Sequence, residues 1–188
     1  MRVIGGKYRS RRLGSAKGMD IRPTSDRLRE TLFDVLTAGN PGALEGTIWL
    51  DLYAGTGAVG IEALSRGAAT VYFVDTDSVA IEVVKRNLAS LGISGGVRII
   101  KRDAVRALED LTSEGVAPDF IFLDPPYRME DVYQKTLQAL AKSHLLKSES
   151  LVIAEHQKRF DPGEEFSSLR RSRKLVQGDA ALSFYRPA

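Results

Sequence analysis

The sequence predicts an α/β protein with a doubly wound, mostly parallel seven-stranded sheet and helices on both faces. Short apolar runs of strand-forming residues alternate with segments of helical periodicity from residue 48 to residue 155. The first of these runs ends in a glycine-rich turn that opens a helix. After residue 155 the alternation stops, and two strand-like runs joined by Gln177-Gly178-Asp179 predict a C-terminal antiparallel hairpin.

The expected elements can be placed in chain order. Residues 1–22 form a basic segment, expected to be a small hairpin extension, and residues 23–188 form the main domain. Thr24 or Ser25 can cap a helix that ends before Gly39. Strands are expected near 48–52, 71–75, 97–101, 120–124, 151–155, 169–176 and 181–185. Further helices are expected near 58–66, 78–91, 103–112 and 130–142.

Composition excludes several classes of protein. A chain of 188 residues suits one domain. Cysteine is absent, which excludes disulfides, thiolate nucleophiles and cysteine-based zinc sites. The two histidines, His144 and His156, disfavour a histidine-rich metal site or a Ser-His triad. No apolar run is long enough for a membrane span or a signal peptide. We therefore expect a cytoplasmic monomer with no metal and no membrane contact.

Positive charge gathers at the N-terminus. Residues 1–29 contain nine Lys or Arg against Asp20 and Asp26, which gives this segment a net charge of +7. The whole chain is +3, so the remainder is −4. A basic arm on an acidic body favours contact with nucleic acid, although a solvated tail would have the same composition. The residues expected to make this contact are Lys7, Arg9, Arg11, Arg12 and Arg22.

The glycine-rich turn predicts a nucleotide-like cofactor. Gly55, Gly57 and Gly60 have G-x-G-x-x-G spacing between a strand and a helix, a pattern that directs backbone N–H groups at a ligand. A P-loop is excluded because Ile61 and Glu62 replace its Lys and Ser/Thr. A dinucleotide site and a purely structural turn remain possible. S-adenosylmethionine fits better, because an acid at the strand end, Asp51, can face the positive ammonium of its amino-acid end.

Acids also follow the next two strands. Asp75 lies twenty residues after Gly55, where a carboxylate can accept hydrogen bonds from both hydroxyls of a ribose. Asp77 is a nearby rival for this role and can instead cap the helix that begins at Ser78. Asp103 can accept a hydrogen bond from an adenine amino group, cap the helix after it, or do both.

The fourth strand is followed by Asp124-Pro125-Pro126-Tyr127, which is the most specific signal in the chain. Two prolines cannot continue a ladder and fix a stiff loop. The loop is expected to present the Asp124 carboxylate, a proline carbonyl without competing local bonds, and the Tyr127 ring. Two acceptors and a stacking ring suit an amino group on a nucleobase, whose nitrogen they can aim at an electrophile without a strong base.

These motifs resemble those of class I S-adenosylmethionine-dependent methyltransferases, which have a Rossmann-like fold. More narrowly, R-P-T-S-D-R-L-R-E-T-L-F at 22–33, the R-V-I-G-G-K-Y-R start and G-D-A-A-L-S-F-Y-R near the end resemble the RsmD family, over nearly the whole chain. That family commonly has Phe and Ser where this chain has Tyr53 and Thr56. The resemblance implies that the cofactor is held by Asp51, Tyr53, Ala54, Gly55, Thr56, Gly57, Asp75, Thr76, Asp103 and Ala104. It implies that the target amine is held by residues 124–127.

The resemblance also implies a reaction: methyl transfer from S-adenosylmethionine to the exocyclic amine of a guanine in small-subunit (16S) ribosomal RNA, within an assembly particle. An adenine-N6 DNA methyltransferase is the nearest alternative, since it shares D-P-P-Y, but such enzymes usually carry a sizeable target-recognition region. An NAD-dependent oxidoreductase would leave residues 124–127 unexplained. A non-catalytic RNA-binding protein would need no intact cofactor acids.

Overall fold

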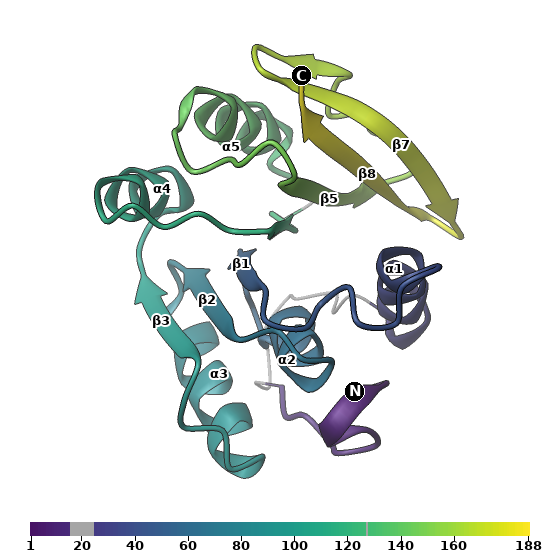
Figure 1. Ribbon diagram of the computed structural model, residues 1–188, viewed down its shortest axis with the longest axis vertical. Coiled ribbons are helices and arrows are strands. Elements are labelled where there is room, and N and C mark those ends of the chain that lie inside the picture. The colour runs from purple at the N-terminus through teal and green to yellow at the C-terminus, as the bar shows by residue number, and fades with distance from the viewer. Residues whose placement is uncertain (16–24, 127) are drawn as a thin grey trace.

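A single mixed sheet organises the molecule. The computed structural model describes residues 1–15, 25–126 and 128–188. Within them, eight strands pair in the order β3-β2-β1-β4-β5-β8-β7-β6 (Figure 1). The first five strands along the chain are parallel, and the last three join the sheet antiparallel to their neighbours. The expected doubly wound α/β fold with a C-terminal hairpin is confirmed.

The parallel part has the expected crossover pattern. Its strands are β1 (Ile48–Leu52), β2 (Thr70–Asp75), β3 (Val97–Lys101), β4 (Phe120–Leu123) and β5 (Leu151–Gln157). Its helices are α1 (Asp26–Thr37), α2 (Ala58–Ser65), α3 (Ser78–Ser90), α4 (Ala104–Ser113) and α5 (Glu130–Lys142). Ser25 caps α1 by accepting a hydrogen bond from the Leu28 N–H, as one of the two expected caps.

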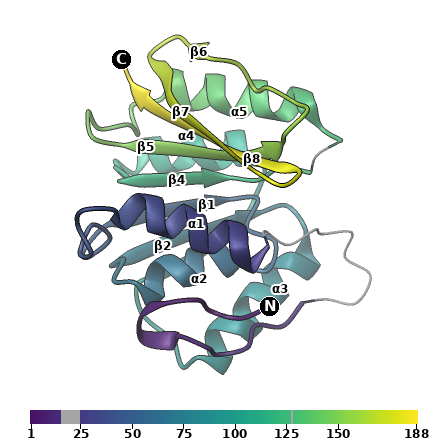
Figure 2. The same ribbon diagram turned by 90° about the vertical axis from the view of Figure 1, so that its right-hand side faces the viewer.

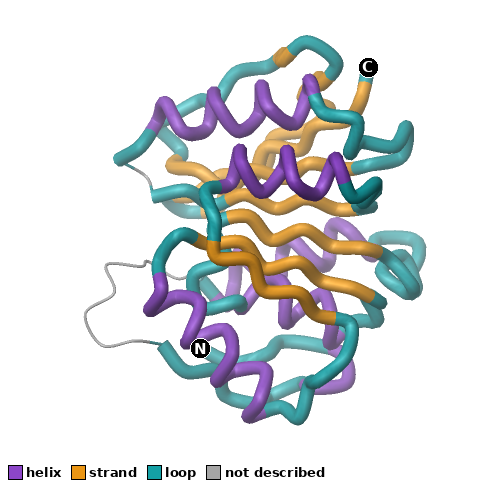
Figure 3. The backbone as a smooth tube through the Cα atoms, turned by 90° about the vertical axis from the view of Figure 1, so that its left-hand side faces the viewer, coloured by secondary structure: helices purple, strands orange, loops and turns teal. Residues whose placement is uncertain are grey.

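Helices cover both faces of the sheet (Figures 1 and 3). On one face, residues of α1, α2 and α3 form a core around Trp49, whose ring stacks against Phe33 at 5.4 Å and Phe120 at 5.3 Å. On the other face, α4 and α5 pack over β1, β4 and β5. The central strands are therefore buried on both faces, as all-parallel sheets require.

The C-terminal hairpin departs from the prediction in two respects. It consists of β7 (Leu169–Gln177) and β8 (Ala180–Pro187), and β8 pairs with β5. An eighth strand, β6 (Glu165–Phe166), pairs with β7, so the expected count of seven is wrong by one two-residue strand. In addition, β5 continues two residues past Glu155 because the antiparallel partner β8 extends its ladder to Gln157.

The N-terminus forms the expected hairpin. Arg2 and Arg12 make an antiparallel bridge, and a short helix, η1 (Gly6–Tyr8), lies at the turn. Val3 and Leu13 are buried against the core beneath α1, α2 and α3. Figure 2 shows the hairpin lying beside α2 and α3 rather than beside the C-terminal strands.

None of the described helices has the length and apolar character needed to cross a membrane.

Candidate active site

The carboxyl ends of the parallel strands bring the predicted acids to one edge of the sheet. Asp51 lies within β1, Asp75 ends β2, Asp103 follows β3 and Asp124 follows β4. Parallel neighbours share this edge, and the registers align Leu52 with Val74 and with Leu123. The acids that were predicted from separate motifs therefore belong to one site.

Asp51 is buried beneath the glycine loop, and its carboxylate accepts a hydrogen bond from the Gly60 N–H at 2.9 Å. Burial raises the pKa of Asp51 to about 8; the Gly60 hydrogen bond lowers this pKa, and the nearby charge of Asp75 raises it. Gly57 has a φ of +76°, which favours glycine, and a Cβ at Gly60 would lie 2.4 Å from the Phe73 ring. The turn and its close contact with β2 thus require these two glycines.

Asp75 connects the glycine loop to the next crossover. One of its carboxylate oxygens accepts from the Gly55 N–H and the other from the Asp77 N–H, both at 2.9 Å. A carboxylate can accept about four hydrogen bonds, so both oxygens keep room for a ligand hydroxyl. Asp77 caps α3 by accepting from the Val79 N–H, as its alternative role predicted.

Asp103 is the N-cap of α4 and accepts from the N–H groups of Val105 and Arg106. The capping role is therefore confirmed, and the adenine role remains a prediction. Tyr53 lies close by: its φ is +63°, uncommon for a residue with a side chain, and its hydroxyl bonds to Thr136 at 2.6 Å. Burial raises the pKa of Tyr53 to about 12, and the charges of Asp103 and Asp75 contribute to this increase.

Asp124 is half-buried beside a fifth acid, Glu155, near the end of β5. Its pKa is raised well above the usual value, first by burial and then by the charges of Glu155 and Asp51. The effect of the Asp51 charge on this pKa indicates that Asp124 lies near Asp51. Glu155 was not predicted as a site residue. Its position near the end of β5, the next strand after β4, could have indicated it, because the other acids were predicted from strand ends.

The proline carbonyls require a correction. The Pro125 carbonyl lies 3.3 Å from the Tyr133 hydroxyl, and the Pro126 carbonyl accepts from the Met129 N–H at 2.9 Å. The expectation of a proline carbonyl without competing local bonds is therefore wrong, because the start of α5 folds back onto the loop. A carbonyl oxygen has two lone pairs, so each can still accept one more hydrogen bond.

The N-terminal basic hairpin is fixed to α2, the helix that follows the glycine loop. The carboxylate of Glu62, fully buried, accepts from the N–H groups of Ile4 and Gly5 at 2.7 and 2.8 Å, and pairs with Arg66. A Cβ at Gly6 would lie 1.8 Å from the Ser65 carbonyl oxygen, so only glycine permits this contact.

Asn87 on α3 joins the hairpin to the glycine loop. Its side-chain amide donates to the Thr56 carbonyl at 2.9 Å, and it exchanges hydrogen bonds with the backbone N–H and C=O of Gly14. Neither Asn87 nor Glu62 was predicted, because both act on residues more than thirty positions away and match no local motif.

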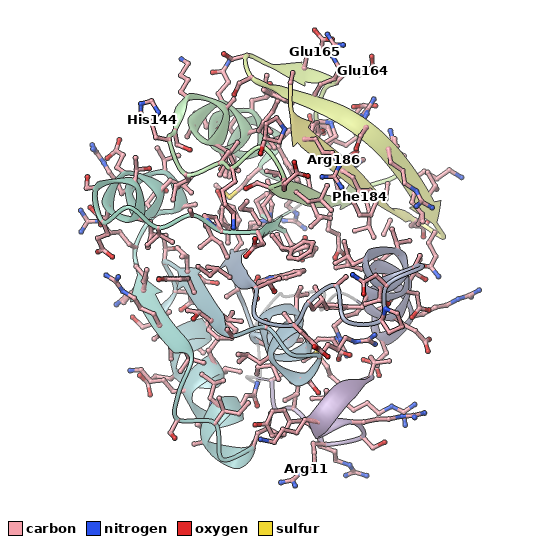
Figure 4. The ribbon with its side chains drawn as sticks, viewed as in Figure 1. Arg11, His144, Glu164, Glu165, Phe184 and Arg186 are labelled. Atoms are coloured by element: carbon pink, nitrogen blue, oxygen red, sulfur yellow. The ribbon has the colours of Figure 1, made fainter. Side chains whose placement is uncertain are left out.

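Four of the five basic residues that were predicted to bind RNA belong to the N-terminal hairpin. Arg11 extends outward from it (Figure 4) and also donates to the Ser90 carbonyl at 3.2 Å. Lys7, Arg9 and Arg12 are exposed. Arg22 and Tyr127, as well as the proposed domain boundary after residue 22, lie outside the described residues. Across residues 1–15, 25–126 and 128–188, no group of three or more His, Asp or Glu side chains has a geometry that could hold a metal ion.

Comparison with known proteins identifies relatives of this chain. The family model described as "Conserved hypothetical protein 95" matches residues 1–186. Ribosomal RNA small subunit methyltransferase D of Escherichia coli (strain K12) is 35% identical over 155 residues, which cover 82% of this chain and 74% of that protein. The same-named protein of Haemophilus influenzae is 31% identical over 159 residues, covering 84% and 79% of the two chains.

Solved structures agree with this comparison. A hypothetical protein from Thermus thermophilus has a TM-score of 0.81 at 30% identity, over 98% of each chain. The match to the family model over nearly the whole chain and the identity with the methyltransferase D relatives lead to one conclusion: this chain belongs to the RsmD family, which includes ribosomal RNA small subunit methyltransferases.

Proposed function

We propose that this protein transfers a methyl group from S-adenosylmethionine to the exocyclic N2 amine of a guanine in small-subunit ribosomal RNA, in the bacterial cytoplasm. The observation that carries the proposal is the position of Asp124: the acid of the D-P-P loop lies close enough to the buried Asp51 for their charges to interact. A site for an amine and a site for a cationic cofactor end would thus be adjacent. The relatives named ribosomal RNA small subunit methyltransferase D support the RNA substrate.

The residues at the glycine loop suit S-adenosylmethionine. Burial raises the pKa of Asp51, and the cofactor ammonium would supply the opposite charge that stabilises its carboxylate form. Asp75 retains acceptor capacity for the ribose hydroxyls. Asp103 would accept a hydrogen bond from the adenine amine. The rest of the cofactor site would be lined by Tyr53, Ala54, Thr56, Thr76 and Ala104. The cofactor, when bound, supplies the electrophilic methyl group.

The residues at the D-P-P loop suit the target amine. The nitrogen of a nucleobase amine becomes positive as it is methylated, and this positive charge would favour the carboxylate form of Asp124, whose pKa in the free protein is raised by burial and by the charges of Glu155 and Asp51. Preorganised charge of this kind stabilises a transition state more than a ground state. Tyr127 would stack on the base, which must leave its helix to reach the pocket.

Identification of the modified nucleoside tests the proposal. The protein and labelled S-adenosylmethionine are incubated with isolated small ribosomal subunits, with naked small-subunit RNA and with duplex DNA, and the product nucleosides are identified by mass. We expect N2-methylguanosine from a ribosomal substrate. N6-methyladenine in DNA would instead establish the alternative, an adenine DNA methyltransferase. No transfer to any substrate, with cofactor binding absent, would contradict both.

A further inference from the structure

A second basic surface lies at the target side of the site, formed by Arg128, Lys158 and Arg159. We infer that these three cations bind the RNA phosphates that flank the target base, on the side opposite the N-terminal hairpin. This inference rests on the proposed function, because it assumes an RNA substrate whose base enters beside Asp124. We call this surface the β4–β5 basic surface.

The topology places the three residues in segments that leave the sheet at the same edge as Asp124. Arg128 follows the D-P-P loop, and Lys158 and Arg159 follow the last residue of β5. Because β4 and β5 are parallel neighbours, with Leu123 aligned with Ala154, both segments leave the sheet at the same edge. Figure 2 shows the turn between β7 and β8 at this edge as well, while the N-terminal hairpin lies at the other end of the sheet.

Aromatic packing fixes the backbone that carries these cations. The Tyr133 hydroxyl lies 2.8 Å from the Glu155 carbonyl and 3.3 Å from that of Pro125, which ties β5 to the D-P-P loop. The Phe160 ring lies 5.0 Å from the Tyr133 ring and 6.1 Å from that of His156. On the other side, the Lys158 N–H donates to the Asp179 carbonyl at 2.8 Å. Lys158 and Arg159 therefore project from a fixed segment.

The charges of the β4–β5 basic surface are available to a ligand. All three side chains are exposed, and none makes an ion pair with another described residue. The nearest acid along the chain, Asp161, is already paired with Arg171 at 2.6 Å and with Lys174 at 2.9 Å. Although burial opposes the shift, hydrogen bonds from these two cations hold the pKa of Asp161 well below its usual value. Asp161 thus does not neutralise the surface.

A pocket accompanies these charges. It has a volume of about 420 Å³ and is lined by Gln157, Lys158, Arg159 and Asp179. Its lining includes two cations and one carboxylate and so has a net positive charge. Arg128 contributes a further positive charge at the same edge of the sheet. Phosphate groups bind such positive concave surfaces, and they position a nucleic acid without reading its bases. Phosphate contacts on both sides of the target would offset part of the free-energy cost of base extrusion.

A pair of matched variants tests the inference. The variant Lys158→Ala/Arg159→Ala removes one lysine and one arginine from the surface, and Arg128→Ala is added in a third protein. The control, Lys142→Ala/Arg186→Ala, removes the same charges from exposed positions at the opposite edge of the sheet, at the end of α5 and near the end of β8. Thermal unfolding of each protein without ligand checks that the fold is retained.

Binding of naked small-subunit RNA is measured against salt concentration. Each phosphate contact contributes about 0.7–0.9 to the slope of log K against log salt, so we expect the surface variant to lose about 1–2 from this slope and about tenfold in affinity near physiological salt. The variant Lys158→Arg/Arg159→Lys should bind like the wild type. Slopes and affinities equal to those of the control would overturn the inference. That result is distinguishable from failure of the proposed function, in which the wild type itself methylates no RNA.

Discussion

The two sides of the carboxyl edge hold their acids differently. On the proposed cofactor side, Asp51, Asp75 and Asp103 all accept hydrogen bonds from backbone N–H groups of the glycine loop or of helix starts. On the proposed target side, Asp124 lies near Glu155, and the pKa of Asp124 is raised by burial and by neighbouring negative charge, with no hydrogen bond from the described residues to oppose the shift. Each of the first three acids is anchored by at least one backbone donor, whereas Asp124 is not.

This difference indicates different tasks. Carboxylates that are anchored by the backbone keep the shape of a cofactor site before the cofactor arrives, which reduces the cost of binding. A carboxyl group without its own donor stabilises a positive group that develops beside it, and an amine under methylation is such a group. We therefore expect cofactor-side changes to act on cofactor affinity and target-side changes to act on turnover.

The largest effect is expected at Asp124. The variant Asp124→Ala should lower kcat by about 10²–10³, the range found when one preorganised electrostatic partner is lost. Its affinity for S-adenosylmethionine should equal that of the wild type, as measured by calorimetry. Wild-type turnover in a folded Asp124→Ala protein would remove this acid from the reaction.

The next largest effect is expected at Asp75, with Asp77 as a matched control two residues away. The variant Asp75→Ala should weaken S-adenosylmethionine binding by about 10–100-fold, because hydrogen bonds to a charged group contribute about 1.5–3 kcal/mol. The variant Asp77→Ala loses only the α3 cap, so it should lower the free energy of unfolding by about 1 kcal/mol and leave cofactor affinity unchanged. Equal affinities for the two variants would show that the assignment of Asp75 is wrong.

A pH dependence is expected from Asp51, whose pKa is raised to about 8. Below that pH the free protein holds a proton that an approaching ammonium must displace, so cofactor affinity should rise with pH between about pH 6 and pH 7.5, by about tenfold per unit at most. Calorimetry in two buffers of different ionisation enthalpy should detect the released proton. The variant Asp51→Asn should lose the dependence.

The same pKa has a consequence for stability. The pKa of the Asp51 carboxyl group is about 8 in the folded protein and 3.8 in the unfolded chain. The free energy of unfolding should therefore decrease as the pH increases from about 3.8 to about 8, because the folded state disfavours the carboxylate form. The variant Asp51→Asn should therefore unfold at a higher temperature than the wild type at about pH 8, while it binds the cofactor less tightly. A lower unfolding temperature at that pH would contradict the burial of an ionisable carboxyl group at this position.

The smallest effect per residue is expected at the exposed arginines of the hairpin. The variant Arg9→Ala/Arg11→Ala/Arg12→Ala should flatten the slope of log K for RNA against log salt by about 2–3, at about 0.7–0.9 per phosphate contact. Cofactor affinity should remain near the wild-type value, because these side chains are exposed on the hairpin. An unchanged slope would mean that these three arginines make no phosphate contacts.

Local patterns predicted most of the fold and the strand-end acids. The glycine loop, the Asp77 and Ser25 caps and the run from Phe120 to Pro126 are each encoded within a few neighbouring residues. Once the sheet is parallel, strand ends must share an edge, so acids far apart in the chain could be assigned to one site.

What could not be predicted depends on long-range pairing. The two-residue strand β6 exists only because β7 provides a ladder, and β5 gains its last residues from β8. Glu62 and Asn87 fix the hairpin through backbone groups that have no sequence signature. The Pro125 carbonyl is occupied because Tyr133, eight residues later, turns back onto it.

Rescue by the cofactor tests most directly whether the two sides have separate tasks. Methyl transfer to small-subunit RNA is measured for Asp75→Ala and Asp124→Ala as the S-adenosylmethionine concentration increases to saturation. We predict that saturation restores most of the wild-type turnover in Asp75→Ala and leaves Asp124→Ala slower by about 10²–10³. Full rescue of Asp124→Ala by the cofactor, or a saturated Asp75→Ala that stays equally slow, would contradict the account.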